Sequence, residues 1–218
     1  MGNANLENQL EQIPKNAQKY IVRGDQNKRD IAPVGKVEHE FIIPLEGFGK
    51  GAAKPTAVNA GVCAGYGFSI NDLGYFSFEV PRDWKEGTDI EIGIHWYIDE
   101  TGAVQVQWAI IWLACAEDGT EDPTAAGATI ESGDVTVPGT ANLLVETDIH
   151  LPGASLSHHD VVLFQVKRIA AVGTDPTAEP VIVSLEAEYT QATPKGLEDL
   201  TAFTTTLVQD LKKQKITK

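Results

Sequence analysis

The sequence has few cysteines, no long apolar run and little positive charge in its central part. Its two cysteines, Cys63 and Cys115, lie in apolar stretches and form no C-x-x-C pair, so we predict buried free thiols rather than a zinc or redox motif. No segment approaches the roughly 20 apolar residues that cross a membrane. The first twenty residues are polar and lack the apolar core of a secretory signal. We therefore expect a protein made in a cytoplasm and soluble there, with no membrane partner.

Basic residues are scarcest in the middle of the chain. Residues 37–194 hold six Lys and Arg against 24 Asp and Glu, whereas residues 1–36 hold six against four and residues 195–218 hold five against three. Phosphate contacts need concentrated Lys and Arg, so the acidic body argues against nucleic acid as a partner. The mildly basic ends are predicted to dock on an acidic partner.

The motifs of common catalytic sites are also missing. No serine lies in a G-x-S-x-G elbow, and no pair of carboxylates stands out for glycoside hydrolysis. The Gly-rich stretch 47–54 superficially resembles a phosphate cradle, but Lys50 precedes Gly51 where a P-loop has Ser or Thr, and Pro55 and a strand-like segment follow. We predict a flexible loop there, and a protein that is not an enzyme and needs no cofactor.

Histidine offers the best candidate for a metal site. His150, His158, His159 and Asp160 lie near one predicted hairpin, and two imidazoles with a carboxylate can bind a transition metal. His158 and His159 are adjacent, however, so in a strand they point to opposite faces. A solvated turn is therefore the prediction, with metal binding as the alternative.

An acidic loop follows the strand that ends near Cys115. Glu117, Asp118, Glu121 and Asp122 offer oxygen ligands of the kind that calcium prefers. Their spacing does not match an EF-hand, because the register D-x-D-x-D-G is missing. We predict an exposed acidic loop.

Alternation of apolar and polar residues predicts a β-sheet protein. It is clearest in residues 88–98, where the apolar residues are Ile90, Ile92, Ile94, Trp96 and Ile98. This period of two is typical of an antiparallel strand with one wet face. About eight strands follow from such patterns, and the links between most of them are too short for the crossovers of a parallel sheet. The predicted fold is all-β, an antiparallel two-sheet jelly-roll-like sandwich.

Two of the predicted strands carry further information. Residues 104–115 are apolar on both faces in their second half, which predicts cover by a loop or by another subunit. In residues 180–189 the pattern predicts one face that carries Val181, Val183, Leu185, Ala187 and Tyr189.

The domain organisation predicted is a polar N-terminal arm over residues 1–36, a β-sandwich body over 37–192, and a short C-terminal helix with a basic tail over 193–218. The helix begins near Pro194 and has a narrow stripe of leucines. The arm holds too little apolar area to order alone, so it is predicted to be either disordered or ordered by a partner that binds it. Its candidate binding residues are Leu6, Leu10, Ile13, Lys15, Lys19, Arg23, Lys28 and Arg29.

The tryptophans separate a core role from a binding role. Trp96, Trp108 and Trp112 lie on the predicted inward faces. Trp84 lies in a turn and Tyr97 on the outer face of its strand, and exposed aromatics at such positions stack on sugar rings. Trp84 as cover for one end of the sandwich is the main prediction, and glycan stacking by Trp84 and Tyr97 is the alternative.

Several segments together resemble a known family. They are Val-Pro-Arg-Asp-Trp at 80–84, Thr-Asp-Ile-Glu-Ile-Gly-Ile-His-Trp at 88–96, Ala-Cys-Ala at 114–116, the run from Leu151 to Arg168, and Glu-Ala-Glu-Tyr at 186–189. Over roughly residues 75–190 this order resembles the jelly-roll domains of tailed-bacteriophage virion proteins, found as capsid decoration proteins, head fibres and tail appendages. Such domains often have an Arg-Asp pair after the penultimate strand. Here Ile169 and Ala170 follow Arg168, and Asp175 comes later.

The resemblance implies a non-enzymatic virion structural protein, made in the host cytoplasm, that commonly assembles as a homotrimer. It implies a major capsid protein or another virion protein as the partner. A capsid decoration role is the first hypothesis, and a carbohydrate- or receptor-binding appendage is the alternative. A third hypothesis is an enzyme with a β-jelly-roll core, such as a metal-dependent cupin-like oxygenase or a glycosidase.

Overall fold

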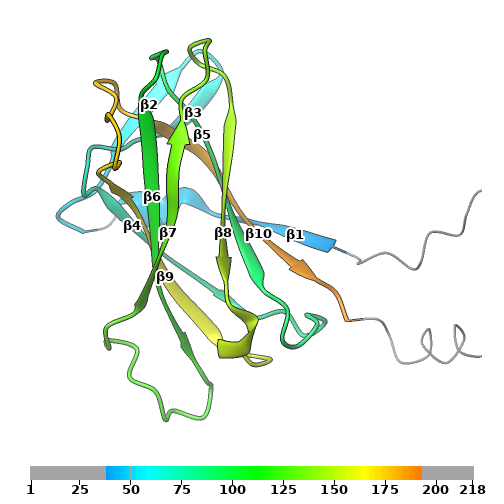
Figure 1. The fold of residues 1–218 in the computed structure, drawn as a ribbon. Helices are drawn as coiled ribbons and strands as arrows, with labels where there is room; N and C mark the ends of the chain where they lie inside the picture. The colour runs from blue at the N-terminus through cyan, green and yellow to red at the C-terminus, as the bar shows by residue number, and fades with distance from the viewer. Residues whose placement is uncertain (1–37, 50, 193–218) are drawn as a thin grey trace, which may run out of the picture. The chain divides into compact units, whose positions relative to one another are not determined.

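Residues 38–49 and 51–192 are described by the structure, a computed structural model of the chain (Figure 1). The predicted arm, the predicted C-terminal helix and all eight candidate binding residues of the arm lie outside these residues. Within them the chain forms ten strands and short 3-10 turns. All strand pairs are antiparallel, as the short links predicted.

The strands form two sheets. The six-stranded sheet has the order β2-β3-β10-β5-β8, with β1 also paired to β10; its strands are β1 (Glu38–Ile43), β2 (Thr56–Ala60), β3 (Cys63–Gly67), β5 (Ile90–Tyr97), β8 (Val145–Leu151) and β10 (Val181–Thr190). The four-stranded sheet has the order β4-β9-β6-β7, with β4 (Leu73–Glu79), β6 (Gln105–Cys115), β7 (Ala128–Thr136) and β9 (Val161–Ile169). The predicted all-β, jelly-roll-like sandwich is confirmed.

The winding of the chain is that of a jelly roll. From β3 to β10 the chain crosses from one sheet to the other at every connection except the one between β6 and β7. As a result β10 lies beside β3 and β5, and β9 lies beside β4 and β6, strands far away in the sequence. Most strand pairs are therefore non-local, which is the arrangement of interlocked Greek keys.

The core lies between the two sheets and is rich in aromatic side chains. Ile90, Ile92, Ile94 and Trp96 of β5 are fully buried, so the predicted alternation is correct. Trp96 packs against Trp108 of the opposite sheet with ring centroids 6.2 Å apart. Aliphatic and aromatic side chains from both sheets thus form one layer between the sheets that excludes water. Burial of this apolar surface is the main source of stability in such a sandwich.

A bulge in β10 corrects the predicted face of that strand. The pairing of β10 with β5 shifts between Ile182 and Ser184, so Val183 is the extra residue. Ile182 is fully buried and Val183 is only partly so, the reverse of the prediction. Beyond the bulge, Leu185 and Ala187 are buried as expected. A bulge re-aims the side chains that follow it.

The Gly-rich stretch is more ordered than predicted. A 3-10 turn over Leu45–Gly49 inserts Phe48, fully buried, against Phe68 and Phe76 with centroid distances of 4.9 Å and 4.7 Å. Close approach requires glycine here, because a Cβ on Gly47 would lie 2.0 Å from the Tyr75 carbonyl oxygen. The prediction of a flexible loop is wrong for this turn, because the buried side chain of Phe48 anchors the segment and the adjacent glycine lets the backbone pack closely.

Candidate functional site

The two ends of the described chain lie at one corner of the sandwich. Strands β1 and β10 are antiparallel neighbours, and Glu38 is paired with Thr190. The chain therefore enters the body at Glu38 and leaves it after Ala192 at the same end of this strand pair (Figure 1). We call the residues around these ends the terminal corner: His39, Asp83, Trp84, Tyr189 and Gln191.

Asp83 is the centre of the hydrogen bonds at the terminal corner. Its carboxylate accepts from the Tyr189 hydroxyl at 2.9 Å and from the Gln191 side-chain amide at 2.7 Å, and its carbonyl accepts from the Ala192 N–H at 2.6 Å. The bond from Gln191 is the largest cause that lowers the pKa of Asp83. Burial, with the bond to Asp83, raises the pKa of Tyr189. The last described residues are thus fixed to the segment that follows β4.

His39 and Trp84 complete the corner. The Nε2 atom of His39 lies 3.0 Å from the Gln191 side-chain oxygen, and its ring lies 5.8 Å from that of Tyr189. Trp84 forms an isolated bridge with Gln191 and donates its indole N–H to the Thr88 carbonyl at 3.1 Å. Both terminal segments therefore start from an ordered platform.

The burial of Trp84 bears on the glycan alternative. Trp84 is 0% exposed, so neither face of its ring is open to a sugar, and its role is to close one end of the core. Tyr97 is partly exposed, and burial raises the pKa of its hydroxyl. The exposed aromatic pair that the glycan hypothesis needs is absent at these two positions, because the turn at Trp84 folds inward.

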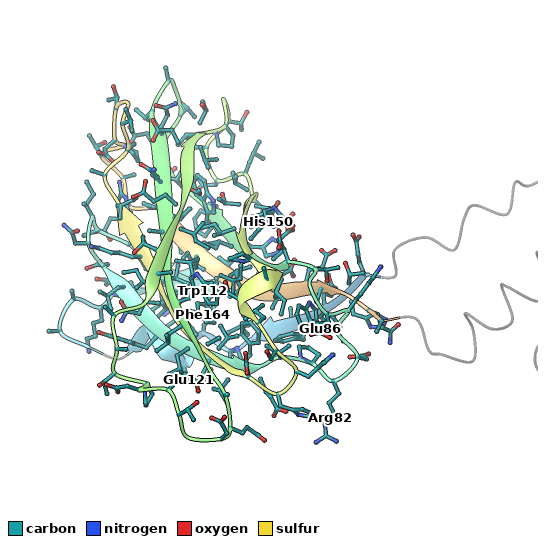
Figure 2. The ribbon with its side chains drawn as sticks, turned by 60° about the horizontal axis from the view of Figure 1, so that its bottom comes forward. Arg82, Glu86, Trp112, Glu121, His150 and Phe164 are labelled. Carbon is teal, nitrogen blue, oxygen red and sulfur yellow. The ribbon has the colours of Figure 1, made fainter. Side chains whose placement is uncertain are left out.

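The outer face of the four-stranded sheet carries an open groove of about 620 Å³. Its floor includes Tyr75 of β4, Leu163 of β9, and Ile111 and Leu113 of β6, and Pro123–Ala125 of the acidic loop form one wall. Trp112 and Phe164 are register partners in the layer below (Figure 2). The second half of β6 is therefore partly covered by a loop, as predicted, but the cover is incomplete.

The histidines singled out in the sequence have three separate sets of contacts. His150 Nδ1 lies 3.2 Å from Glu91, His159 Nδ1 lies 3.0 Å from Glu79, and the His158 ring lies 5.5 Å from that of Trp84. Asp160 is buried and accepts from the Ser157 N–H at 2.8 Å. The structure does not bring these side chains together around one point.

The acidic loop is organised by its own side chains. Asp118 accepts from the Thr120 N–H and hydroxyl at 3.0 Å and 2.7 Å, and Asp122 accepts from the Thr124 N–H and hydroxyl at 2.8 Å and 2.7 Å. These bonds lower the pKa of both aspartates. The two carboxylates stabilise successive turns rather than a common point, so the sequence prediction of an exposed acidic loop describes them well.

The outer face of the six-stranded sheet is acidic, a feature that the sequence analysis did not recognise. Strand pairing places Glu40, Glu188, Glu91 and His150 side by side on β1, β10, β5 and β8. None of the six strands of this sheet contains Lys or Arg. The signal was present as acidic residues at alternate positions, but the strand register that joins them is set by non-local pairing.

Comparison with known proteins gives little further information. No family model and no curated protein matches the chain. Among solved structures, the structure of infectious bursal disease virus, Gt strain, and a mutant VP2 protein of the same virus in derived T=1 particles each match with 11% identity and a TM-score of 0.27. Each match covers 64% of this chain but only 38% and 37% of the viral chains. Because this score is too low to establish a shared topology, the function proposed below rests on this chain's own residues.

In the part of the chain that the structure describes, no helix is long and apolar enough to span a membrane.

Proposed function

We propose that the chain is a non-enzymatic structural protein of a virion, made in the host cytoplasm, that decorates the capsid or another part of the head. In this proposal the β-sandwich projects outward, and the terminal segments bind a major capsid protein or another virion protein. The jelly-roll winding and the resemblance to tailed-bacteriophage virion proteins support this role.

The observation that carries the proposal is the terminal corner. Both terminal segments start at the same end of the β1–β10 pair, so both can reach one surface while the rest of the body faces away from it. A partner that binds an attachment segment of the folded protein stabilises that protein by mass action. Two such segments on one corner raise each other's effective concentration at that surface.

Charge supports an attachment through the arm rather than through the body. Residues 1–36 carry the candidate cations Lys15, Lys19, Arg23, Lys28 and Arg29. The outer face of the six-stranded sheet has only carboxylates and histidines as charged groups on its strands. An acidic shell surface therefore attracts the arm and repels the sheet face, which orients the body outward.

The proposal includes assembly as a homotrimer. The groove on the four-stranded sheet gives partly exposed apolar side chains, including Ile111, Leu113 and Leu163, that a second subunit can cover. The mass of the protein in solution, measured by light scattering, tests the trimer. A mass of three chains agrees with a homotrimer, and a monomer at all concentrations contradicts it.

Co-sedimentation with purified particles of the virus that encodes the chain tests the attachment. Deletion of residues 1–36, or exchange of the five arm cations for Glu in the full chain, is expected to abolish association while the body keeps its β-sheet circular dichroism. A control exchanges the body cations Lys54 and Lys167, which lie near the start of β4 and away from the terminal corner, for Glu and should still associate. Unchanged association of both arm variants would contradict attachment through the arm, and exchange of Lys212, Lys213 and Lys215 then tests the C-terminal segment.

A further inference from the structure

Three potential metal ligands converge on the outer face of the six-stranded sheet. They are His95 of β5, Glu146 of β8 and Glu186 of β10, and one ligand atom of each lies within 4.8 Å of the other two. His95 Nε2 lies 3.1 Å from a Glu186 carboxylate oxygen and 3.7 Å from one of Glu146. Ligand atoms that share one zinc ion at bond lengths of about 2.0–2.2 Å lie about 3–4 Å apart. Small side-chain rotations therefore suffice to close the three ligands on one ion.

The backbone beneath these side chains leaves space for them. Gly93 faces Glu186 across the β5–β10 pair, and a Cβ on Gly93 would lie 2.9 Å from Glu186 Cγ and 3.4 Å from the Glu146 carboxylate. The bulge at Val183 fixes the register that brings Glu186 opposite Gly93 and Ser184 opposite His95. The two glutamates thus lean over a position without a side chain.

Two carboxylates face one imidazole at this point. Glu146 and Glu186 direct their carboxylates at the same imidazole, and Asp148 lies across from Gly93 on the other side. No strand of this sheet carries Lys or Arg. The two carboxylates come from β8 and β10, on either side of β5. Like charges this close repel each other, and a divalent ion bound between them replaces repulsion by coordination.

We propose that His95, Glu146 and Glu186 bind a divalent transition-metal ion, with Zn²⁺ as the ion that fits best. An imidazole nitrogen with two carboxylate oxygens suits Zn²⁺ better than Ca²⁺ or Mg²⁺, which prefer oxygen ligands alone. The ligands come from three adjacent strands, so the bound ion ties β8, β5 and β10 together. Because β10 leads to the terminal corner, the ion also stabilises the strand from which the C-terminal segment starts.

Titration of the chelator-treated full chain with ZnCl₂ in a calorimeter tests the site. We expect saturable binding of one Zn²⁺, a higher melting temperature with Zn²⁺, and a visible absorption band when Co²⁺ replaces Zn²⁺. Loss of an outer-sphere partner costs about 10–100-fold in metal affinity, so His95→Gln or Glu186→Gln, which remove a direct ligand, should weaken binding at least about 100-fold. Glu146→Gln changes a half-exposed side chain and keeps the test valid where the other variants fail to fold.

Two further variants separate this site from other metal ligands on the chain. Gly93→Ala keeps all three ligands but fills the space between the glutamates, so it should weaken binding as well. His150→Gln removes a histidine of β8 that pairs with Glu91 of β5. This variant should bind Zn²⁺ like the unaltered protein. The proposal would be overturned if the unaltered protein did not bind Zn²⁺, or if the His95 and Glu186 variants bound Zn²⁺ as tightly as the unaltered protein. Displacement of Zn²⁺ by an equal concentration of Ca²⁺ would overturn it as well.

Discussion

Tyr189 donates its hydroxyl to Asp83 at 2.9 Å, and this bond joins the last strand of the body to the segment that follows β4. Gln191 donates to the other oxygen of the same carboxylate at 2.7 Å. The two bonds make Asp83 the residue on which the order of the terminal corner depends. Hydrogen bonds to a charged group contribute about 1.5–3 kcal/mol, so this carboxylate is expected to matter for stability as well as for the direction in which the chain leaves.

Asp83→Asn tests this contribution. An amide NH₂ in place of one carboxylate oxygen faces a donor, so one of the two bonds is lost, and we expect the free energy of unfolding to fall by about 1–2 kcal/mol. Urea unfolding followed by fluorescence measures the change. The nearby exposed Glu86 (Figure 2) provides the control, since Glu86→Gln should change stability by less than about 0.5 kcal/mol. Equal effects of the two substitutions would argue against a special role for Asp83.

The same carboxylate predicts how stability changes in acid. The pKa of Asp83 is lowered in the folded protein, first by the bond from Gln191, so the folded state holds the proton less tightly than the unfolded chain. The resulting stability is present above the unfolded pKa of about 3.9 and is lost as the pH falls through the lower folded value. Unfolding curves between pH 7 and pH 3 should show a shallower acid loss for Asp83→Asn than for the unaltered chain. Parallel curves would show that Asp83 has the same pKa in both states.

The two central tryptophans offer a matched comparison in the core. Trp96 and Trp108 are both fully buried. Trp96 donates its indole N–H to Thr147 at 2.9 Å, whereas the indole nitrogen of Trp108 has no hydrogen-bond partner among the residues that the structure describes. Trp→Phe removes similar volume at both sites. We therefore expect Trp96→Phe to cost about 1 kcal/mol more than Trp108→Phe, the usual net value of one hydrogen bond. Thermal and urea unfolding of both variants measure the difference, and a larger loss for Trp108→Phe would contradict it.

Arg168, near the end of β9, has an acidic partner seven residues later in the chain. Arg168 is buried, donates to the Phe68 carbonyl at 2.6 Å, and lies 3.8 Å from Asp175. Loss of one partner of a buried pair costs about 3–5 kcal/mol, but Asp175 is partly exposed and water screens the pair. We expect Asp175→Asn to cost about 1–2 kcal/mol.

A double-mutant cycle shows whether this cost comes from the pair. In an Arg168→Met background, Asp175→Asn should change the free energy of unfolding by less than about 0.5 kcal/mol. An undiminished cost in that background would mean that Asp175 acts through its bond from the Ala171 N–H instead.

The sequence predicts the body well where the alternation is strict. Every second residue of β5 is apolar, so its buried face follows directly from the pattern. In β10 the residues Val181, Ile182 and Val183 are all apolar and β-branched, so alternation does not reveal which of them is the extra residue of the bulge. Only pairing with β5, from a distant part of the chain, decides it.

Residues that act together across strands are harder to find. His95, Glu146 and Glu186 are separated by 51 and 40 positions in the sequence, and each by itself is an ordinary polar residue on the wet face of a strand. Their convergence depends on the order β10-β5-β8 and on the register of both pairs. Phe48 was missed for a related reason, because the glycines around it permit close packing but also suggest a flexible loop.

The central claim is that the protein is part of a virus particle, and its location tests this most directly. An antibody raised against residues 37–192, applied to purified particles of the virus that encodes the chain, locates the protein by immunogold electron microscopy. The account predicts gold on the outside of the particle head, at repeated positions. Gold absent from intact particles, with the protein recovered only from the soluble fraction of infected cells, would contradict it.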